Sequence, residues 1–225
     1  MKPLSDEKIL ACWRQNVTPW IAAVRDGEIE SRVLVTSQAI IDVVLVCEPK
    51  SALDLGCGEG WLARELVKAG IDTLGVDAVP GFVEAALQAG GGRFKAIPFE
   101  LLSQAAICER FDVVVCNFSL LGNEVVTHLF QHMPSLLNDD GALVVQTIHP
   151  VEGCGDKRYE DGWRTGSWAG FSDEFSEPAP WYFRTLETWR SLFIEHGFLL
   201  NKIIEPINPK SSRPASIIFV GVLTC

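Results

Sequence analysis

The stretch "LDLGCGEGWLARELVKAG", residues 53–70, constrains the fold most, because three glycines fall within five residues between an apolar run and a helix-like segment. Leu62, Leu66 and Ala69 recur at helical spacing, and Gly70 is typical of a helix end. A strand, a glycine-rich turn and a helix together present backbone N–H groups at a helix N-terminus, where open α/β sheets bind ligands. The stretch therefore predicts an α/β fold with a ligand site at this loop.

From residue 51 onward, short apolar runs alternate with helix-like segments, which indicates a mostly parallel sheet covered by helices on both faces. Helices are expected at 59–69, from Pro80 to the glycines at 90–92, at 124–137 and at 185–196, with a turn at 138–141. The last two strands are joined directly, so we expect a hairpin with the last strand antiparallel. The sequence thus predicts a Rossmann-like sheet of seven strands: "SALDLG", "DTLGVD", "RFKAI", "FDVVVCNF", "ALVVQTI", "FLLNKIIE" and "ASIIFVGVLT".

The domain organisation follows from where this alternation begins and where it is interrupted. Residues 1–48 predict a helical cap with two apolar stripes, which could cover the sheet edge or fold over a ligand. Residues 49–225 form the sheet domain, and 151–184 interrupt it with an insert rich in Gly, Trp, Pro and acidic residues. Inserts of that length are usually functional or mobile, so we place this one on the substrate side. The stripes are Trp13, Trp20, Ile21 and Val24, then Val33, Ile40, Ile41 and Val44.

Charge and cysteine content limit the partners and the compartment. The net charge of −10 works against a nucleic-acid binder, and the densest basic stretch, "NPKSSRP", is short. The start "MKPLSDEKIL" is not a signal peptide, and no apolar run has transmembrane length. The seven cysteines contain no C-x-x-C pair, and His128 and His132 lack a third metal ligand. We expect a cytoplasmic monomer or homodimer without a metal or a membrane partner.

Three ligand classes use a glycine loop of this kind, and the residues after it separate them. A P-loop would require Gly-Lys-Ser/Thr, whereas Gly60 is followed by Trp61 and Leu62. The dinucleotide fingerprint would require a glycine at position 61, so NAD and FAD are disfavoured. A ligand with adenosine but no phosphate also needs bare backbone, together with an acid for the ribose hydroxyls. Asp77 supplies that acid at the end of the second strand, and Asp54 can orient the loop or an ammonium group through water.

The stretch "LDLGCGEGWLARELVKAGIDTLGVDAVPGFVEAA" resembles the first two motifs of class I S-adenosylmethionine-dependent methyltransferases, in the small-molecule branch similar to quinone-biosynthesis enzymes. "FDVVVCNFSLL", "LLNDDGALVVQTIHP" and "YFRTLETWRSLFIEHGF" resemble later segments of that group, so the resemblance covers residues 51–225. It implies S-adenosylmethionine as cofactor, S-adenosylhomocysteine as product and a small-molecule acceptor. One departure is "AIPFELL", which lacks the acidic residue that members often carry after the third strand for adenine.

The resemblance also implies the cofactor residues by motif position. It assigns backbone contacts with the methionine part to the loop glycines, the ribose to Asp77 and the methionine side of the cleft to the end of the fourth strand. Arg32, ahead of the first strand, could pair with the cofactor carboxylate or lie on a solvated helix face. The predicted cofactor-binding set is Arg32, Asp54, Gly56, Cys57, Gly58, Gly60, Asp77, Ala78, Asn117 and Phe118.

Catalysis of methyl transfer requires alignment, exclusion of water and, for a hydroxyl acceptor, removal of one proton. His149 leaves the fifth strand at "TIHP" and is the predicted base, unless it is bonded to backbone before Pro150. The aromatic residues of the insert could wall a planar or apolar substrate or form a small core of their own. The predicted substrate residues are Trp163, Trp168, Tyr182 and Arg184.

Two other functions remain open at this stage. A protein that binds S-adenosylmethionine without catalysis would have an open, unwalled acceptor side. A tRNA or protein methyltransferase would carry a coherent basic face or an appended recognition domain. The aromatic insert argues against the first, and the charge distribution argues against the second.

Overall fold

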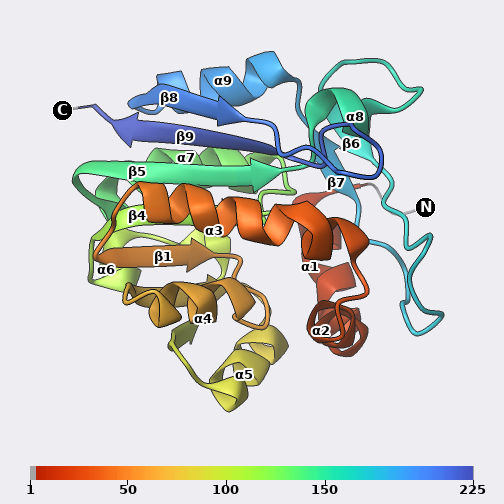
Figure 1. Cartoon of the computed structure of the whole chain (residues 1–225), viewed down its shortest axis with the longest axis horizontal. Coiled ribbons are helices and arrows are strands. Elements are labelled where there is room, and N and C mark those ends of the chain that lie inside the picture. The colour runs from red at the N-terminus through yellow and green to blue at the C-terminus, as the bar shows by residue number, and fades with distance from the viewer. Residues whose placement is uncertain (1–3, 225) are drawn as a thin grey trace.

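The computed structural model describes residues 4–224 and is built around one mixed sheet (Figure 1). The strand order is β3-β2-β1-β4-β5-β9-β8. The strands β1 to β5 run parallel, and β9 pairs antiparallel with both β5 and β8. The predicted seven-stranded, mostly parallel sheet with an antiparallel last strand is therefore confirmed. The strands are β1 (Ser51–Leu55), β2 (Asp72–Asp77), β3 (Arg93–Ala96), β4 (Phe111–Asn117), β5 (Leu137–Thr147), β8 (Phe198–Ile204) and β9 (Ile217–Leu223).

Helices cover both faces of the sheet, which explains why its central strands are apolar without alternation. Along β4, Val113 and Val115 pack under α3 (Ser37–Val46) and α4 (Trp61–Lys68). Val114 and Cys116 point to the opposite face, which α7 (Glu124–Leu136) and α9 (Leu186–Glu195) cover. The helix α5 (Pro80–Ala89) packs beside β3 and begins with the expected proline.

The N-terminal segment is helical as expected, and its two apolar stripes have different destinations. The first helices, α1 (Asp6–Gln15) and α2 (Val17–Arg25), lie beyond the ends of the strands (Figure 1). A π-helical turn, η1 (Arg32–Thr36), leads into α3, whose Ile40 and Val44 are fully buried on the sheet. Ile40, Ile41 and Val44 of the second stripe thus cover the sheet, whereas Val33 is 65% exposed, and the first stripe is left to face the strand ends.

Two segments differ from the sequence prediction. β5 starts at Leu137, immediately after α7, and so begins before the expected turn at 138–141. These four residues form an unpaired bulge between Leu137 and Ala142, with φ of +60° at Asp140. Leu137 pairs with Phe111, and the Asn138 amide donates to the Asp112 carboxylate at 2.8 Å, which holds this stretch on β4. The chain between β3 and β4 also forms two short helices that its sequence does not predict: η2 (Phe99–Leu101) and α6 (Gln104–Ile107).

The insert contains regular structure as well. It begins with α8 (Pro150–Cys154), and its ends pair as an antiparallel ribbon of β6 (Gly162–Arg164) and β7 (Trp181–Phe183). Strands of three residues are too short to produce a readable alternation of apolar and polar residues, which is why the sequence gives no sign of them. The ribbon closes a loop of chain that reaches back to the N-terminal helices.

Asn16, between α1 and α2, joins the cap to this loop. Its side chain is fully buried, its amide donates to Cys12 and Glu177 carbonyls at 2.8 and 3.2 Å, and its oxygen accepts the Ser176 N–H at 2.8 Å. The cap and the insert therefore share a buried polar contact across about 160 residues of chain.

Replacing Asn16 by alanine is expected to lower the free energy of unfolding by about 1–3 kcal/mol, because the hydrogen bonds of this buried side chain to Cys12 and Ser176 are lost. The insert should also become more sensitive to limited proteolysis. Urea denaturation and timed digestion measure the two effects. The exposed neighbour Gln15→Ala is the control, and equal behaviour of the two variants would contradict the role given to Asn16.

Candidate functional site

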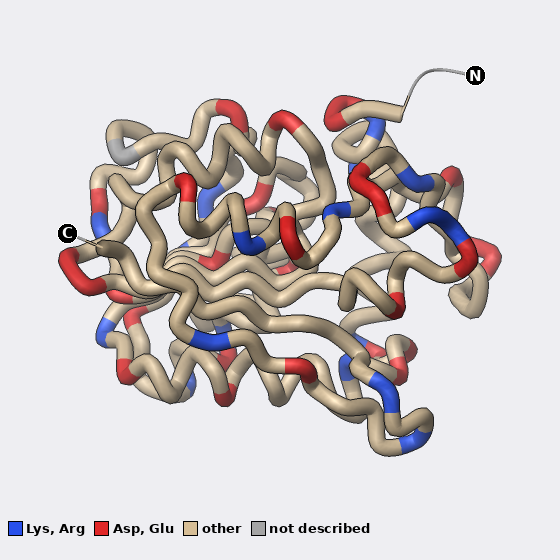
Figure 2. Tube along the Cα trace, turned by 90° about the horizontal axis from the view of Figure 1, so that it is seen from above, with Lys and Arg blue, Asp and Glu red and all other residues tan. Residues whose placement is uncertain are grey.

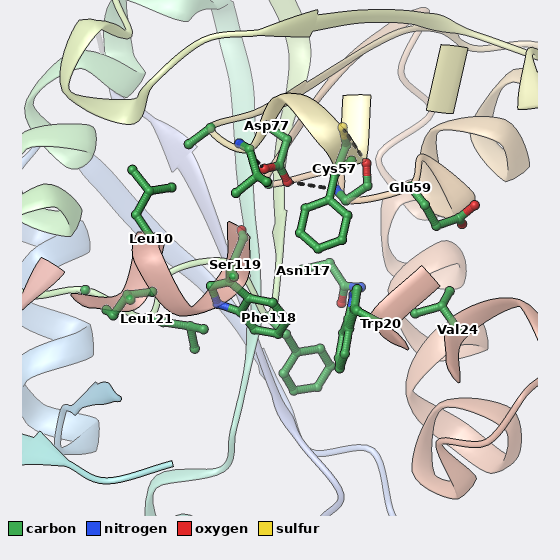
Figure 3. A pocket seen from close by; sticks show the side chains of 18 of the residues that line it. Leu10, Trp20, Val24, Cys57, Glu59, Asp77, Asn117, Phe118, Ser119 and Leu121 are labelled. Carbon is green, nitrogen blue, oxygen red and sulfur yellow. Dashed lines mark hydrogen bonds between the residues drawn. The ribbon is translucent and has the colours of Figure 1, made fainter. Parts of the chain in front are cut away.

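A cavity of about 380 Å³ opens at the carboxyl ends of β1, β2 and β4. The strand order reverses between β1 and β4, and ligands of open α/β sheets bind at such a reversal. Figure 3 shows Asp77 and Cys57 on one side of the cavity, and Leu10 and Trp20 reaching in from the cap. The cavity thus lies between the glycine loop and the N-terminal helices.

The glycine loop is bare partly because the protein itself approaches it closely. Gly56 has φ of +77°, and a Cβ there would lie 2.2 Å from the Ser119 Cβ. Gly60 has φ of +85°, and a Cβ there would lie 2.7 Å from the Phe94 ring. Gly58 has no such neighbour, and its N–H donates to the Asp77 carboxylate at 2.9 Å. The loop is therefore held against β2 and β4 before any ligand binds.

Asp77 ends β2 and fixes the floor of the cavity. Besides the Gly58 N–H, its carboxylate accepts the Val79 N–H at 2.8 Å. Burial raises the pKa of Asp77 to about 6, although the hydrogen bonds from Val79, Gly58 and Ala78 act in the opposite direction. A carboxylate held by backbone at the edge of a cavity can accept hydroxyl donors from a ligand, as the ribose role requires.

Two buried oxygen atoms near Asp77 have no hydrogen-bond partner among the described residues. They are Oδ2 of Asp54, inside β1, and Oδ1 of Asn117, at the end of β4. Burial, followed by repulsion from Asp77, raises the pKa of Asp54 to about 7. Buried oxygens without donors cost free energy, so this corner favours a ligand that brings N–H donors or positive charge.

Arg32 brings positive charge to the same corner from η1. Its guanidinium lies 4.7 Å above the centre of the Trp61 ring and lines the cavity. Burial lowers its pKa to about 10, while Glu59 and Asp54 favour its charged form, so it stays cationic at neutral pH. Stacking on Trp61 fixes the plane of the guanidinium, and its fork of N–H donors matches a ligand carboxylate.

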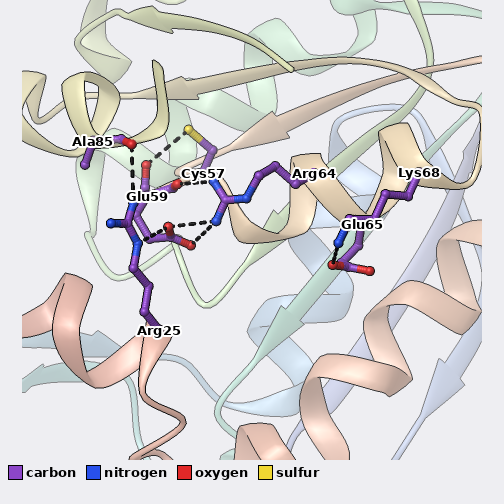
Figure 4. A network of polar contacts seen from close by, with 8 residues as sticks. Arg25, Cys57, Glu59, Arg64, Glu65, Lys68 and Ala85 are labelled. Atoms are coloured by element: carbon purple, nitrogen blue, oxygen red, sulfur yellow. Dashed lines mark hydrogen bonds and ion pairs between the residues drawn. The ribbon is translucent and has the colours of Figure 1, made fainter. Parts of the chain in front are cut away.

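Glu59, between two loop glycines, forms an ion network that the sequence analysis did not find (Figure 4). Its buried carboxylate accepts two bonds of 2.7 Å from Arg64 and one of 3.0 Å from Arg25. Arg25 also donates to the Ala85 carbonyl, at 3.3 Å. Arg25 belongs to α2, so the network ties the cap to the glycine loop. The available sequence signal was an acidic residue in the loop followed five residues later by an arginine, which is less conspicuous than the glycines.

Aromatic residues from the cap and the insert form the opposite wall of the cavity. Trp13 contacts Trp20 and Trp168 with ring centres 4.9 and 5.7 Å apart. Phe171 stacks on Trp20, with ring centres 6.3 Å apart. All four side chains line the cavity. The first apolar stripe of the sequence was the available signal for this wall, since it contains both cap tryptophans.

The structure brings most of the predicted cofactor residues together. Arg32, Cys57, Asp77, Ala78 and Asn117 line the cavity. Asp54 and Gly60 lie just behind this lining, next to the residues that form it. The remaining members of the set that line the cavity are Gly56, Gly58 and Phe118.

Of the predicted catalytic and substrate residues, only Trp168 lines the cavity. Trp163 packs edge-on against Tyr182, with ring centres 5.5 Å apart, in the β6–β7 ribbon. Arg184 is buried behind it and donates to the Asn123 carbonyl at 3.0 Å, and burial lowers its pKa to about 10. Trp163 and Tyr182 thus belong to the insert's own packing, which was the alternative interpretation for its aromatic residues, and Arg184 holds backbone at the start of α7.

His149 also lies outside the described lining of the cavity. Its Nε2 is 2.8 Å from the Glu205 carboxylate, and its Nδ1 accepts the Glu152 N–H at the start of α8. The side chain is buried and joins the end of β5 to the segment between β8 and β9. This geometry matches a histidine that holds backbone and a carboxylate in place.

Comparison with known proteins shows the family of the chain. A family model described as a methyltransferase domain matches residues 38–202. The chain belongs to this methyltransferase family. A ubiquinone biosynthesis O-methyltransferase of Azorhizobium caulinodans is 33% identical over 108 residues, which are 43% of this chain and 40% of that protein. The chain spans less than half the length of the curated relatives it matches.

Solved structures share the fold at lower identity. A 1,6-didemethyltoxoflavin-N1-methyltransferase of Burkholderia thailandensis, with bound 1,6-didemethyltoxoflavin and S-adenosylhomocysteine, superposes with a TM-score of 0.67 at 16% identity and covers 100% of this chain and 93% of its own. An S-adenosylmethionine-dependent methyltransferase of Clostridium acetobutylicum gives 0.67 at 14% identity, covering 92% and 98%. The expected family and fold are confirmed.

The buried carboxylates predict how the stability of the ligand-free protein depends on pH. Between the ordinary aspartate pKa of 3.8 and the raised values of about 7 and about 6, the folded protein keeps protons that the unfolded chain has released. The free energy of unfolding is therefore expected to fall as pH rises from about 4 to about 7. Urea denaturation across this range measures the slope.

Asp54→Asn should remove much of that slope, because an amide does not ionise. The exposed Asp156→Asn is the matched control and should keep the wild-type slope. A wild-type protein whose stability rises over this pH range would contradict the argument.

His149→Ala is expected to lower the free energy of unfolding by about 1–2 kcal/mol, because the Glu152 N–H loses its acceptor and Glu205 its partner. The affinity for a ligand in the cavity should stay close to the wild-type value. Thermal denaturation and ligand titration separate the two effects. A loss of turnover with unchanged stability would instead support His149 as the base.

Proposed function

We propose that this chain is an enzyme that transfers the methyl group of S-adenosylmethionine to a small, planar and largely apolar acceptor. The observation that carries the proposal is one cavity with two unlike sides: a polar side of glycine loop, Asp77, Asn117 and Arg32, and an aromatic side from cap and insert. Family membership and the fold of S-adenosylmethionine-dependent methyltransferases support it.

The polar side fits the cofactor in each of its parts. Asp77 would hold the ribose hydroxyls, and the backbone of the glycine loop would follow the methionine part. The guanidinium of Arg32 would pair with the carboxylate of that part, and the unpartnered oxygens of Asp54 and Asn117 suit its ammonium group. When bound, S-adenosylmethionine supplies an electrophilic methyl group on a positively charged sulfur.

The aromatic side would bind and align the acceptor. Trp13, Trp20, Trp168 and Phe171 offer ring faces for a flat molecule, and they exclude water from the reacting atoms. The names of two similar proteins refer to ring compounds: a ubiquinone biosynthesis O-methyltransferase and a 1,6-didemethyltoxoflavin-N1-methyltransferase. These names support a ring acceptor here. The walled cavity argues against a purely regulatory S-adenosylmethionine-binding protein.

The remaining expectations concern partners and compartment. Acidic and basic positions are interspersed around the molecule (Figure 2), which supports a small-molecule substrate rather than nucleic acid. None of the helices within residues 4–224 combines the length and apolarity needed to cross a membrane. The cysteines that the structure describes are free thiols, which supports a reducing, cytoplasmic setting.

Calorimetric titration tests the proposal directly. We expect the protein to bind S-adenosylmethionine and not NAD⁺, and Arg32→Met to weaken that binding about tenfold or more, because a charge-assisted contact is lost. Arg14→Met, on the exposed face of α1, is the matched control and should bind like the wild type. Heat with NAD⁺ but none with S-adenosylmethionine would refute the proposed function.

A further inference from the structure

Methyl transfer to an acceptor that carries a proton requires a group that removes this proton. The titratable groups of the cavity therefore determine which acceptors can react. Within the described residues these groups are Asp6, Arg32, Cys57, Glu59, Asp77 and Glu100. On the cofactor side, the Glu59 carboxylate is already paired with Arg25 and Arg64. Burial raises the pKa of the Cys57 thiol well above its ordinary value, so this thiol stays protonated at neutral pH. Neither the paired Glu59 carboxylate nor the protonated Cys57 thiol is therefore suited to take a proton from an acceptor on the aromatic wall.

Asp6 lines the cavity from α1, the helix that also carries Trp13 of that wall. Its two oxygens accept the Asn123 and Val125 N–H groups at 2.7 and 2.9 Å, at the N-terminus of α7. Both oxygens of the carboxylate are thus occupied by backbone donors, and its negative charge is placed at the end of the helix that favours it. Asp6 therefore docks the cap onto α7. Glu100 is exposed on η2, at the rim, where water competes for any proton.

Trp168 offers the acceptor a hydrogen-bond donor instead. Its indole N–H is buried and has no partner among the described residues, although the side chain lines the cavity. It sits among Trp13, Phe171 and Phe175, whose ring centres lie 5.7, 5.5 and 4.5 Å away and which offer no acceptor oxygen. A buried donor of this kind costs free energy unless a ligand supplies a lone pair.

On the basis of the proposed function, these observations narrow the chemical class of the acceptor. We propose that the acceptor is a flat aromatic or heteroaromatic molecule whose methyl-accepting atom carries no proton at neutral pH, as in an ionised acidic phenol, an ionised thiol or an unprotonated ring nitrogen. A second lone pair of the same molecule accepts the Trp168 N–H.

The reaction then needs no proton transfer to the protein. The lone pair of the acceptor forms a bond to the methyl carbon, the carbon–sulfur bond breaks, and its electron pair remains on sulfur. An anionic acceptor becomes a neutral methylated product. The protein contributes alignment between the aromatic rings, exclusion of water and the Trp168 hydrogen bond.

An acceptor panel with S-adenosylmethionine tests the proton argument. Its phenols are 4-nitrophenol and 4-methylphenol, and 4-nitrobenzyl alcohol matches the first in shape but carries a hydroxyl that does not ionise. Benzenethiol and 6-methoxyquinoline represent sulfur and ring nitrogen, and the methoxy oxygen of the latter offers the second lone pair. We expect methylation of ionised or unprotonated members only, with the rise of kcat/KM with pH shifting toward about pH 10 for 4-methylphenol, as tyrosine-like ionisation requires.

A binding experiment tests Trp168 without turnover. In the complex with S-adenosylhomocysteine, Trp168→Phe should weaken binding of 4-nitrophenolate about five- to tenfold, the usual effect of one lost hydrogen bond, and should leave cofactor affinity unchanged. Trp163→Phe, in the ribbon outside the cavity lining, is the control and should have no effect.

The outcomes separate this inference from the proposed function. Failure to bind S-adenosylmethionine would refute the proposed function. If the cofactor binds, methylation of 4-nitrobenzyl alcohol, one shared pH dependence for both phenols, or methylation of no panel member would overturn the inference alone. An unchanged affinity in Trp168→Phe would overturn the role given to its N–H.

Discussion

The hydrogen bond from the Gly58 N–H to the Asp77 carboxylate is the contact on which the site depends. It joins the loop after β1 to the end of β2, and the Val79 N–H completes the carboxylate's anchoring. Without this contact, a loop of three glycines with positive φ would sample many conformations at a high entropic cost. With it, the loop is ordered before ligand binding, so the ligand does not have to supply that free energy.

The same contact concentrates negative charge under the loop. Glu59 is neutralised by two arginines, whereas Asp54 and Asp77 lie close together without a cation bonded to either in the described structure. A native structure can retain this unfavourable electrostatic free energy where ligand binding removes it. An ammonium group would offset the charge at Asp54, and two ribose hydroxyls would donate to Asp77. The raised pKa of Asp54 thus describes a site that is less stable alone than with its ligand.

The sequence predicted the sheet, and the group of residues that line the cavity at its strand ends, because both depend on local patterns. Apolar runs, the glycine loop and Asp77 lie within one stretch of chain, and parallel topology brings their strand ends together. The acceptor side depends on contacts between segments about 160 residues apart, such as that between Asn16 and Ser176, which no local pattern encodes. His149 follows the end of a strand, as a catalytic residue would, but its Nε2 contacts the carboxylate of Glu205, which comes from a distant loop.

The two sides of the cavity are also mechanically connected. Arg25 holds α2 to Glu59 in the cofactor loop, and α2 carries Trp20 of the acceptor wall. Because Glu59 is flanked by Gly58 and Gly60, a ligand that contacts these glycines also restrains the carboxylate to which the cap is attached. Occupation of the glycine-loop side is therefore expected to rigidify the aromatic wall, since both are joined through the buried Glu59 carboxylate. Such coupling would favour cofactor binding before the acceptor, because the aromatic rings then meet the acceptor in a fixed arrangement.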